Sequence, residues 1–313
     1  MMLIIVYFLS ILICIANNDI DPIIILKGVK SFREQVPPSH LLIKIDAQDA
    51  ITRNIFYLDV IFDKELRRFI YTNSNVSDRL IYNGNEVLHF YPPKYINIRA
   101  LDGSFGGHLF DPRILGISAL LSKINTLDTQ IPVENNNANI KYIGKEYLDD
   151  NETYHISINM TDGTKIQYWI DVKKEFRIYK YRIDYNTFYR IAQSRYSDQY
   201  KWLPTYVQVN EYNNSGNINW KSTIEIIKAD AGIKIPSYLW TIAGLDAPIG
   251  AEVTDLRNQK LIGYWDGKRL IQYTDRKSHQ QPKVPRMLLI GVITVVFIAP
   301  LLVILVRKFR KAM

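Results

Sequence analysis

The side chains that could do chemistry in this chain are few and dispersed. Its histidines are His40, His89, His108, His155 and His279. No two of them are close enough in the sequence to suggest a metal-binding pair. The sequence contains neither a Gly-x-Ser-x-Gly nucleophile elbow nor a phosphate-binding glycine loop, and it has one cysteine. We therefore predict a protein that is not an enzyme, with no catalytic residue, no metal site and no cofactor.

The most site-like string is Gly103-Ser104-Phe105-Gly106-Gly107-His108. Two glycines beside a histidine can form a loop whose backbone N–H groups bind an oxyanion, and this keeps a hydrolase that uses His108 as a minor hypothesis. The alternative interpretation is a flexible turn that leads into a helix. We favour the turn, because Asp111 followed by Pro112 is typical of a helix cap and a first helical residue.

One apolar segment near the C-terminus is long enough to cross a membrane. Residues 287–306 carry no charge, and at 1.5 Å per residue a helix of that length spans roughly the 30 Å hydrocarbon core of a bilayer. The basic tail at 307–313 follows at once and predicts a cytoplasmic C-terminus. Residues 274–286 lack apolar periodicity and are predicted to form a juxtamembrane linker.

The N-terminus has features of a signal peptide. Leu3 to Ile15 is an apolar run that is short for a membrane span. We predict a signal peptide at 1–17 and an exported domain at 18–273. An uncleaved N-terminal anchor stays open, because no basic residue precedes the run and Ile15-Ala16-Asn17 is a poor cleavage site. Ile13 disfavours lipid attachment at Cys14, since lipoprotein signals have a small residue there.

Charge and cysteine content indicate the compartment. The net charge is +8, but the tail contributes Arg307, Lys308, Arg310 and Lys311, and the remainder gives no case for nucleic-acid binding. A mature chain without Cys14 cannot form a disulfide, which is unusual for a eukaryotic cell-surface domain. We predict a single-pass protein of the bacterial inner membrane, with its N-terminal domain in the periplasm and its C-terminus in the cytoplasm.

The exported domain consists mostly of predicted strands. Short alternating runs rich in Ile, Tyr and Val are separated by Gly, Asn and Asp. In the run from Glu175 to Tyr185, simple alternation puts Arg177 and Tyr179 on the same face as Tyr181 and Ile183. The short links between runs favour an antiparallel meander over βαβ units.

The clearest hairpin lies at Thr161-Asp162-Gly163. A two-residue loop would put the apolar stripes of its two strands on opposite faces. A three-residue loop instead pairs Ile158 with Ile166 and Tyr154 with Ile170, and it needs Gly163 in the left-handed conformation. We predict the three-residue loop.

Two helices are expected beside the sheet. The first begins at Asp21-Pro22 and has an apolar stripe of Val29, Phe32 and Val36. The second begins at Asp111-Pro112 and runs for three to four turns to about Asn125. A sheet of this size is expected to curl. The predicted fold class is mainly β (α+β), a curved antiparallel sheet or half-barrel with two or three helices, plus one C-terminal transmembrane helix.

The concave face of such a sheet, covered by a helix, is a natural site for an apolar ligand. The predicted lining is the hairpin face: Tyr154, Ile156, Ile158, Ile166, Tyr168 and Ile170. Burial of ligand methylene groups would contribute about 0.8 kcal/mol each. The alternative is that the same face is packed under the helix with no cavity left.

Three charged residues are candidates for polar contacts. Arg113 is poorly placed for the helix dipole and could pair with Asp255. Asp255 and Arg257 lie two apart, so they share a face of an extended segment. A structural ion pair between these two is the simpler interpretation, and a contact to a lipid headgroup is the alternative.

The order of parts carries a resemblance. A helix comes first, then strands through Phe62-Asp63 and Tyr82-Asn83-Gly84, the helix at Asp111-Pro112-Arg113, the hairpin at Asp162-Gly163 and strands ending in Tyr264-Trp265-Asp266-Gly267. This order resembles the periplasmic lipoprotein-carrier fold, the LolA/LolB-like group. The resemblance implies a curved antiparallel sheet around an acyl-binding cavity. The carriers are soluble or lipid-anchored, so a C-terminal span makes the chain similar to a membrane-tethered member.

Two functions remain open. The first is a membrane-anchored periplasmic domain that binds a hydrophobic ligand in a half-barrel cavity, with a lipid or an acylated protein as its partner. The second is a non-enzymatic envelope sensor or scaffold that binds a protein partner and has a filled core.

Overall fold

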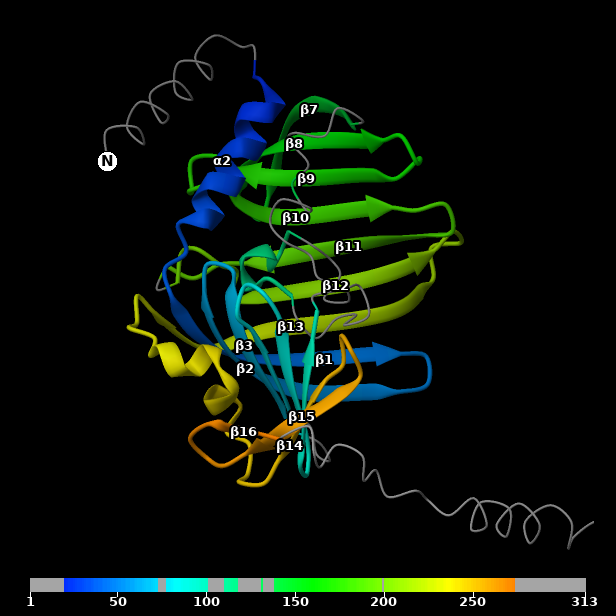
Figure 1. Ribbon diagram of the computed structural model, residues 1–313. Coiled ribbons are helices and arrows are strands. Elements are labelled where there is room, and N and C mark those ends of the chain that lie inside the picture. Colours follow the sequence, from blue (N-terminus) through cyan, green and yellow to red (C-terminus); the bar gives the residue numbers. More distant parts are fainter. Residues whose placement is uncertain are drawn as a thin grey trace, which may run out of the picture.

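The computed structural model describes residues 20–72, 77–100, 110–117, 131, 138–198 and 200–273. These residues form one sheet of sixteen strands, one α-helix and three 3₁₀ helices. The sheet curls along its length, and the α-helix lies on one side of it (Figure 1). The mainly β fold class, with one open curved sheet and few helices, is therefore confirmed.

The sheet has two arms and a C-terminal extension. The first arm comprises β1 (Ser39–Asp49), β2 (Arg53–Asp63), β3 (Leu66–Thr72), β4 (Ser77–Tyr82), β5 (Val87–Tyr91) and β6 (Tyr95–Arg99). The second comprises β7 (Ala138–Leu148), β8 (Asn151–Met160), β9 (Lys165–Asp171), β10 (Arg177–Asp184), β11 (Phe188–Arg195), β12 (Tyr206–Asn213) and β13 (Ile218–Ala231). The extension comprises β14 (Glu252–Asp255), β15 (Lys260–Trp265) and β16 (Leu270–Gln272).

Each arm is a meander, and two pairings join the parts. β1 pairs antiparallel with β13, so the first strand of the chain lies inside the sheet and not at its edge. β14 pairs with β6 in parallel, whereas the other pairings of the described strands are antiparallel. The predicted antiparallel meander is thus confirmed within each arm, whereas β1–β13 and β6–β14 join strands that are far apart in the chain, and β6–β14 is in addition parallel.

The first predicted helix is confirmed as α2 (Pro22–Glu34). The Asp21 carboxylate accepts a hydrogen bond from the Ile23 N–H at 2.8 Å, and Pro22 fills the first helical position, where no N–H is needed. The stripe residues Val29, Phe32 and Val36 are buried. Burial of this stripe, more than helix propensity, holds the helix on the sheet.

The second predicted helix is wrong over its described part. Asp111 caps a single 3₁₀ turn, η1 (Pro112–Ile114), and Leu115 is already extended, with φ −54° and ψ 126°. Ile114, Leu115 and Ile117 are all buried, with exposures of 0%, 2% and 0%. An amphipathic α-helix would expose some of these consecutive residues, whereas an irregular segment inside the curl buries them all. Residues 118–125 lie outside the described part of the chain.

The predicted hairpin register is confirmed at β8 and β9. Ile158 pairs with Ile166, and Tyr154 pairs with Ile170. The Met160 N–H donates to the Thr164 carbonyl at 2.9 Å and closes a three-residue loop. Gly163 has φ +85°, the left-handed conformation that the loop requires.

The predicted alternation along β10 is wrong, because a bulge interrupts it. Ile178 pairs with Ile170, but Lys180 pairs with Trp169, so Tyr179 is an extra residue. Ile178 and Tyr181 therefore lie on the same buried face. Arg177, which precedes Ile178, lies on the other face and not beside Tyr181 and Ile183.

The sheet has a hydrophobic core on each face. The larger core lies on the concave face and includes residues of both arms, α2 and residues 110–117. The smaller core lies on the opposite face of β4–β6 and is covered by the 3₁₀ helices η2 (Ser237–Trp240) and η3 (Ile242–Leu245). The neighbouring residues Leu80 and Ile81 of β4 belong to different cores, as the alternation of a strand requires.

The predicted terminal segments are not among the residues that the structure describes. These are the signal peptide at 1–17, the linker at 274–286, the span at 287–306 and the tail at 307–313. Within residues 20–273, leaving out the gaps, no helix has the length and the apolar character needed to cross a membrane. The C-terminal transmembrane helix therefore stays a prediction.

Candidate functional site

The predicted lining residues lie together on the concave face. Five of them, on β8 and β9, are 0–1% exposed, and Ile166 is half-buried. The confirmed register places them side by side in one apolar surface. Their role in binding a ligand stays a prediction, and their burial shows that the surface is covered.

Residues 110–117, called the strap below, form part of that cover. Phe110, Ile114, Leu115 and Ile117 of the strap belong to the same core as the hairpin residues. The apolar stripe of α2 belongs to it as well, and α2 contacts both β7 and η1. In the described part of the chain, the concave face is thus covered by separate elements, the strap and α2.

The aromatic residues of the face bring hydroxyl groups but no charge. Tyr168 on β9 and Tyr181 on β10 lie with their ring centroids 5.3 Å apart. Burial raises the pKa of both phenols well above the ordinary value, so both stay neutral at any physiological pH. This part of the face is suited to the apolar part of a ligand, such as an acyl chain.

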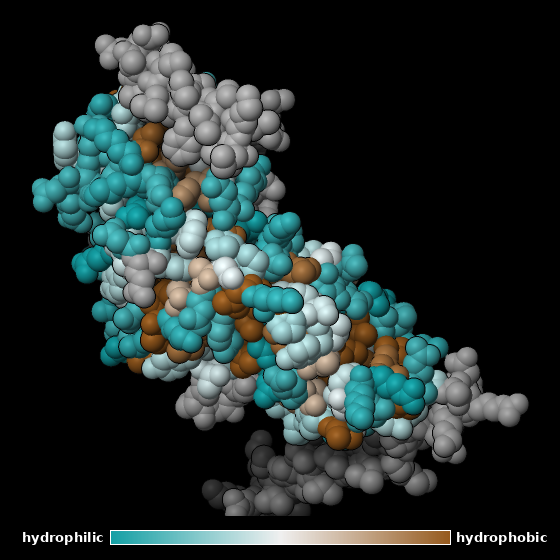
Figure 2. Space-filling view, turned by 90° about the vertical axis from the view of Figure 1, so that its left-hand side faces the viewer, coloured by the Kyte–Doolittle hydropathy of each residue, from teal (hydrophilic) through white to brown (hydrophobic). Residues whose placement is uncertain are grey.

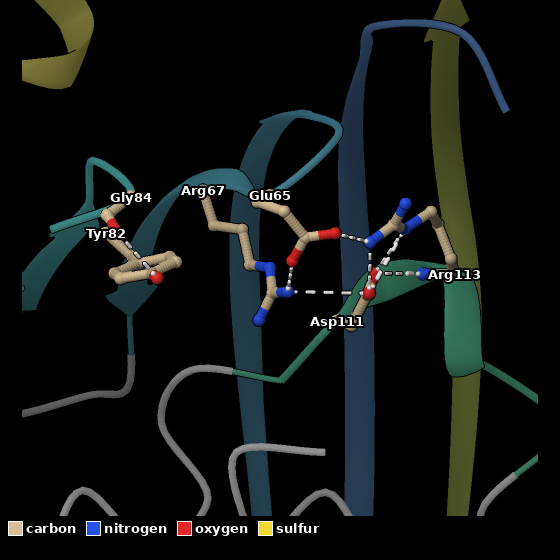
Figure 3. Close-up of polar contacts among 6 residues, drawn as sticks. All are labelled: Glu65, Arg67, Tyr82, Gly84, Asp111 and Arg113. Atoms are coloured by element: carbon tan, nitrogen blue, oxygen red, sulfur yellow. Dashed lines mark hydrogen bonds and ion pairs between the residues drawn. The ribbon is translucent and has the colours of Figure 1, made fainter. Parts of the chain in front are cut away.

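Four charged side chains attach the strap to the sheet (Figure 3). The fully buried Asp111 carboxylate accepts from Arg113 Nη2 at 2.7 Å and lies 3.4 Å from Arg67 Nη2 on β3. Glu65, in the turn before β3, accepts from Arg113 Nη2 at 2.5 Å and from Arg67 Nη2 at 3.0 Å. We call Glu65, Arg67, Asp111 and Arg113 the latch. It links the strap to the start of β3 through two arginines and two carboxylates.

The electrostatics of the latch favour its charged form. Burial lowers the pKa of the Arg113 guanidinium, but the hydrogen bonds and charges of Asp111 and Glu65 outweigh this effect and hold the pKa above its ordinary value. The Arg67 guanidinium also lies 5.9 Å from the ring centroid of Tyr82, whose hydroxyl donates to the Gly84 carbonyl (Figure 3). Arg113 thus remains a cation inside the protein.

The predicted pairing of Arg113 with Asp255 is wrong. Arg113 is held by its strap neighbour Asp111 and by Glu65, whereas Asp255 accepts from Arg257 Nη2 at 2.8 Å. The structural ion pair between Asp255 and Arg257 is confirmed, and the hydrogen bonds from Arg257 lower the pKa of Asp255. Arg257 also donates to Glu86. A contact of Arg257 with a lipid headgroup stays a prediction.

Sequence reasoning missed three residues of this region. Glu65 meets Arg113, and Arg67 meets Asp111, only through the tertiary structure, and no local sequence pattern indicates these two contacts. Arg33 on α2 did leave a signal, because it follows Leu26 and Val29 at helical spacing on the buried stripe. A cation on the buried side of a helix is unusual, and it indicates a residue with a specific structural or functional role.

Three of the five histidines, His40, His89 and His155, lie in the part of the chain that the structure describes. Among the described residues, no group of three or more His, Cys, Asp or Glu side chains is placed to hold a metal ion. His155 binds Glu146 at 2.7 Å and stacks on Trp169 on the face opposite the strap. The string 103–108, with His108, lies outside the described residues.

The outer surface offers no single apolar patch on the side shown in Figure 2. Hydrophobic residues there are interspersed with hydrophilic ones.

No protein-family model and no curated protein matches this sequence. Solved structures do match it. A DUF1329 family protein from Desulfovibrio piger is 12% identical, with 72% of this chain and 100% of that chain covered, at a TM-score of 0.50. A LolA superfamily protein, NE2245 from Nitrosomonas europaea, is 14% identical, with 72% and 100% covered, at 0.47. A putative outer membrane lipoprotein-sorting protein domain from Vibrio parahaemolyticus is 8% identical, with 72% and 97% covered, at 0.48.

These likenesses concern the fold alone. At 12% identity the Desulfovibrio piger protein shares the arrangement of the chain and nothing finer. The helix α2, the curled antiparallel sheet and the strap inside it appear in the order that the sequence resemblance implies. The chain has a LolA/LolB-like fold.

Proposed function

We propose that this protein is a non-enzymatic, membrane-anchored periplasmic domain that holds an apolar ligand, an acyl chain or a lipoprotein lipid, on the concave face of its sheet. One observation carries the proposal: the hairpin face is continuous, uncharged and apolar, and separate elements cover it. The LolA/LolB-like fold supports it, because the resemblance implies an acyl-binding cavity. The partner is then a lipid or an acylated protein.

The arrangement gives the ligand a way to displace part of the cover. The strap is attached to β3 through the latch, while its apolar side chains rest on the core. A bound acyl chain would replace the contacts of Phe110 and Ile114. Ten buried methylene groups contribute about 8 kcal/mol before the cost of immobilising the chain is subtracted.

The proposed location in the inner membrane follows from the sequence alone. The predicted span at 287–306 would anchor the domain in the bacterial inner membrane, with the basic tail at 307–313 in the cytoplasm. A tethered domain cannot leave its membrane, so it would receive or sense a lipid and not carry it between membranes.

One observation favours a second candidate function. Five of the six lining residues are 0–1% exposed, as expected of a core that is already filled. In that case the domain is an envelope sensor or scaffold that binds a protein partner on its surface.

Photo-crosslinking of the full chain in bacteria separates the two candidates. Benzoylphenylalanine replaces Tyr168 of the lining in one variant and Tyr147 of β7, which is 72% exposed, in a matched control. An acyl-lipid adduct at position 168 but not at 147 supports the ligand proposal. No lipid adduct at 168, with a protein adduct at 147, refutes it in favour of the second candidate.

A further inference from the structure

Arg33 is a buried cation whose side-chain hydrogen bonds to the described residues are with neutral groups. It is 1% exposed and lies in the last turn of α2. Its Nη1 donates to the Arg113 backbone carbonyl at 3.2 Å, and its Nη2 donates to the Tyr196 hydroxyl at 3.1 Å. Among the described residues no carboxylate forms an ion pair with it. A buried charge without a counter-ion is costly, so its presence needs an explanation.

The two carboxylates of the latch are already engaged by other arginines. Asp111, whose charge acts on Arg33, is bound by Arg113 and Arg67, and Glu65 is bound by the same two arginines. Arg33 and the latch together carry three positive and two negative charges, a net charge of +1 (3 − 2). The excess belongs to Arg33, since the four latch groups balance one another.

The tyrosine that contacts Arg33 leaves it no counter-charge. The Tyr196 hydroxyl donates to the Ile178 carbonyl and accepts from the Ile178 N–H, and burial raises the pKa of its phenol, so it stays neutral. Desolvation also lowers the pKa of Arg33, which reflects the cost of its charge at this place. The C-terminal end of the α2 dipole offsets a part of that cost.

The strap couples this charge to the proposed ligand site. The carbonyl that accepts from Arg33 Nη1 belongs to Arg113, which is a residue of the strap. When a ligand displaces the strap, Arg33 loses that acceptor and the nearby charge of Asp111 together. A guanidinium would then face the interior with two or more free N–H groups, arranged to bind a carboxylate or a phosphate.

We propose that Arg33 binds the anionic end of the ligand, so that the natural ligand is an anionic amphiphile with its acyl chain on the hairpin face. This inference rests on the proposed function. It adds the class of ligand: a chain that ends in a carboxylate or a phosphate and not in a neutral group. Acetate or inorganic phosphate alone, without an acyl chain, is expected not to bind.

The test compares two ligands that differ in one charge. The full chain in neutral detergent is titrated with palmitate and with methyl palmitate at about pH 8.5, well above the pKa of a carboxyl group in water. The measured quantity is the ratio of the two affinities. Partition into micelles is the same for every variant and cancels when ratios are compared. Acetate and inorganic phosphate serve as chain-free competitors.

The variants are Arg33→Gln, Arg33→Lys and the control Arg53→Gln. The control removes an arginine whose side chain is 60% exposed and which pairs with Asp46. We expect the wild type and the control to bind palmitate at least about tenfold more tightly than the ester, since charged hydrogen bonds are strong when buried. Arg33→Gln should bring the ratio close to one without weakening the ester. Arg33→Lys should keep part of the preference.

Each outcome separates this inference from the proposed function. Equal binding of acid and ester by the wild type overturns the role of Arg33 but leaves an apolar site in place. Binding of neither ligand overturns the proposed function. A ratio that Arg33→Gln leaves unchanged also refutes the inference. If Arg33→Gln does not fold, the affinity ratio of the wild type and that of Arg33→Lys still test the inference.

Discussion

Replacement of Asp111 with asparagine removes the charge at the centre of the latch and keeps the shape of the side chain. The Asp111 carboxylate accepts from the Arg113 N–H at 3.0 Å, from Arg113 Nε at 2.9 Å and from Nη2 at 2.7 Å, and it lies 3.4 Å from Arg67 Nη2. An amide keeps an oxygen for the backbone N–H. It also turns an NH₂ group towards two buried guanidinium groups.

The expected loss of stability follows from the burial of the three charged side chains. Asp111 is fully buried, and Arg67 and Arg113 are 2% and 6% exposed. Removing one partner of a buried ion pair costs about 3–5 kcal/mol, because the other charge is left uncompensated. The side chain of Glu65 is 56% exposed and can move towards either arginine. We therefore expect a loss at the lower end, about 3 kcal/mol of unfolding free energy.

Urea unfolding followed by tryptophan fluorescence measures this loss. A decrease of about 3 kcal/mol moves the midpoint down by on the order of 1 M urea. Asp46→Asn is the matched control, since Asp46 also accepts from an arginine, Arg53, but at the surface. A solvent-exposed pair of this kind contributes little, so the control midpoint should stay near that of the wild type.

A double-mutant cycle tests the cause. Asp111→Asn combined with Arg113→Gln should cost clearly less than the sum of the two single changes, because the second change removes the uncompensated charge. If Asp111→Asn unfolds at the wild-type urea concentration, or if the two changes are additive, the buried ion pair does not hold the strap and the reasoning fails.

Two further predictions concern glycines. Gly28→Ala in α2 should destabilise the fold by about 1–3 kcal/mol, because a Cβ there would lie within 2.8 Å of three atoms of the Phe176 ring and overpack the core. This loss is expected even though alanine favours a helix by about 1 kcal/mol relative to glycine. Thermal unfolding measures this, and a variant more stable than the wild type would contradict the packing of α2. Gly163→Ala should cost about 1–2 kcal/mol, because residue 163 has φ +85°. Gly144→Ala on β7 is the control for both, since its Cβ would meet no atom within 4 Å; a Gly163→Ala variant as stable as Gly144→Ala would argue against the three-residue loop.

The local features of the fold could be predicted because their causes are local. Asp21-Pro22 specifies the start of α2 through one side-chain hydrogen bond and one missing N–H. The hairpin at Gly163 is determined by a positive φ and by two apolar stripes that have to share a face. The ion pair of Asp255 and Arg257 likewise joins residues two apart.

The incorrect predictions arise where tertiary packing outweighs the local pattern. The periodicity after Asp111 fits a helix, but the interior of the curl buries Ile114, Leu115 and Ile117 together, and the helix ends after one turn. The bulge at Tyr179 adds a residue that alternation cannot anticipate. Arg113 pairs with Glu65, 48 residues away, instead of Asp255, because strand order and not sequence separation brings side chains together.

By itself the sequence determined the β-rich class of the fold, the capped first helix, and a hairpin whose apolar face is the candidate ligand site, whereas the signal peptide and the anchor stay predictions. These follow from alternation, capping and hydrophobic length, which act over a few residues. The tertiary structure alone decided how the face is covered, how the latch holds the strap, and that Arg33 is buried with no ion pair to a described carboxylate. These depend on contacts between residues far apart in the chain, which form only when both arms of the sheet close around the same core.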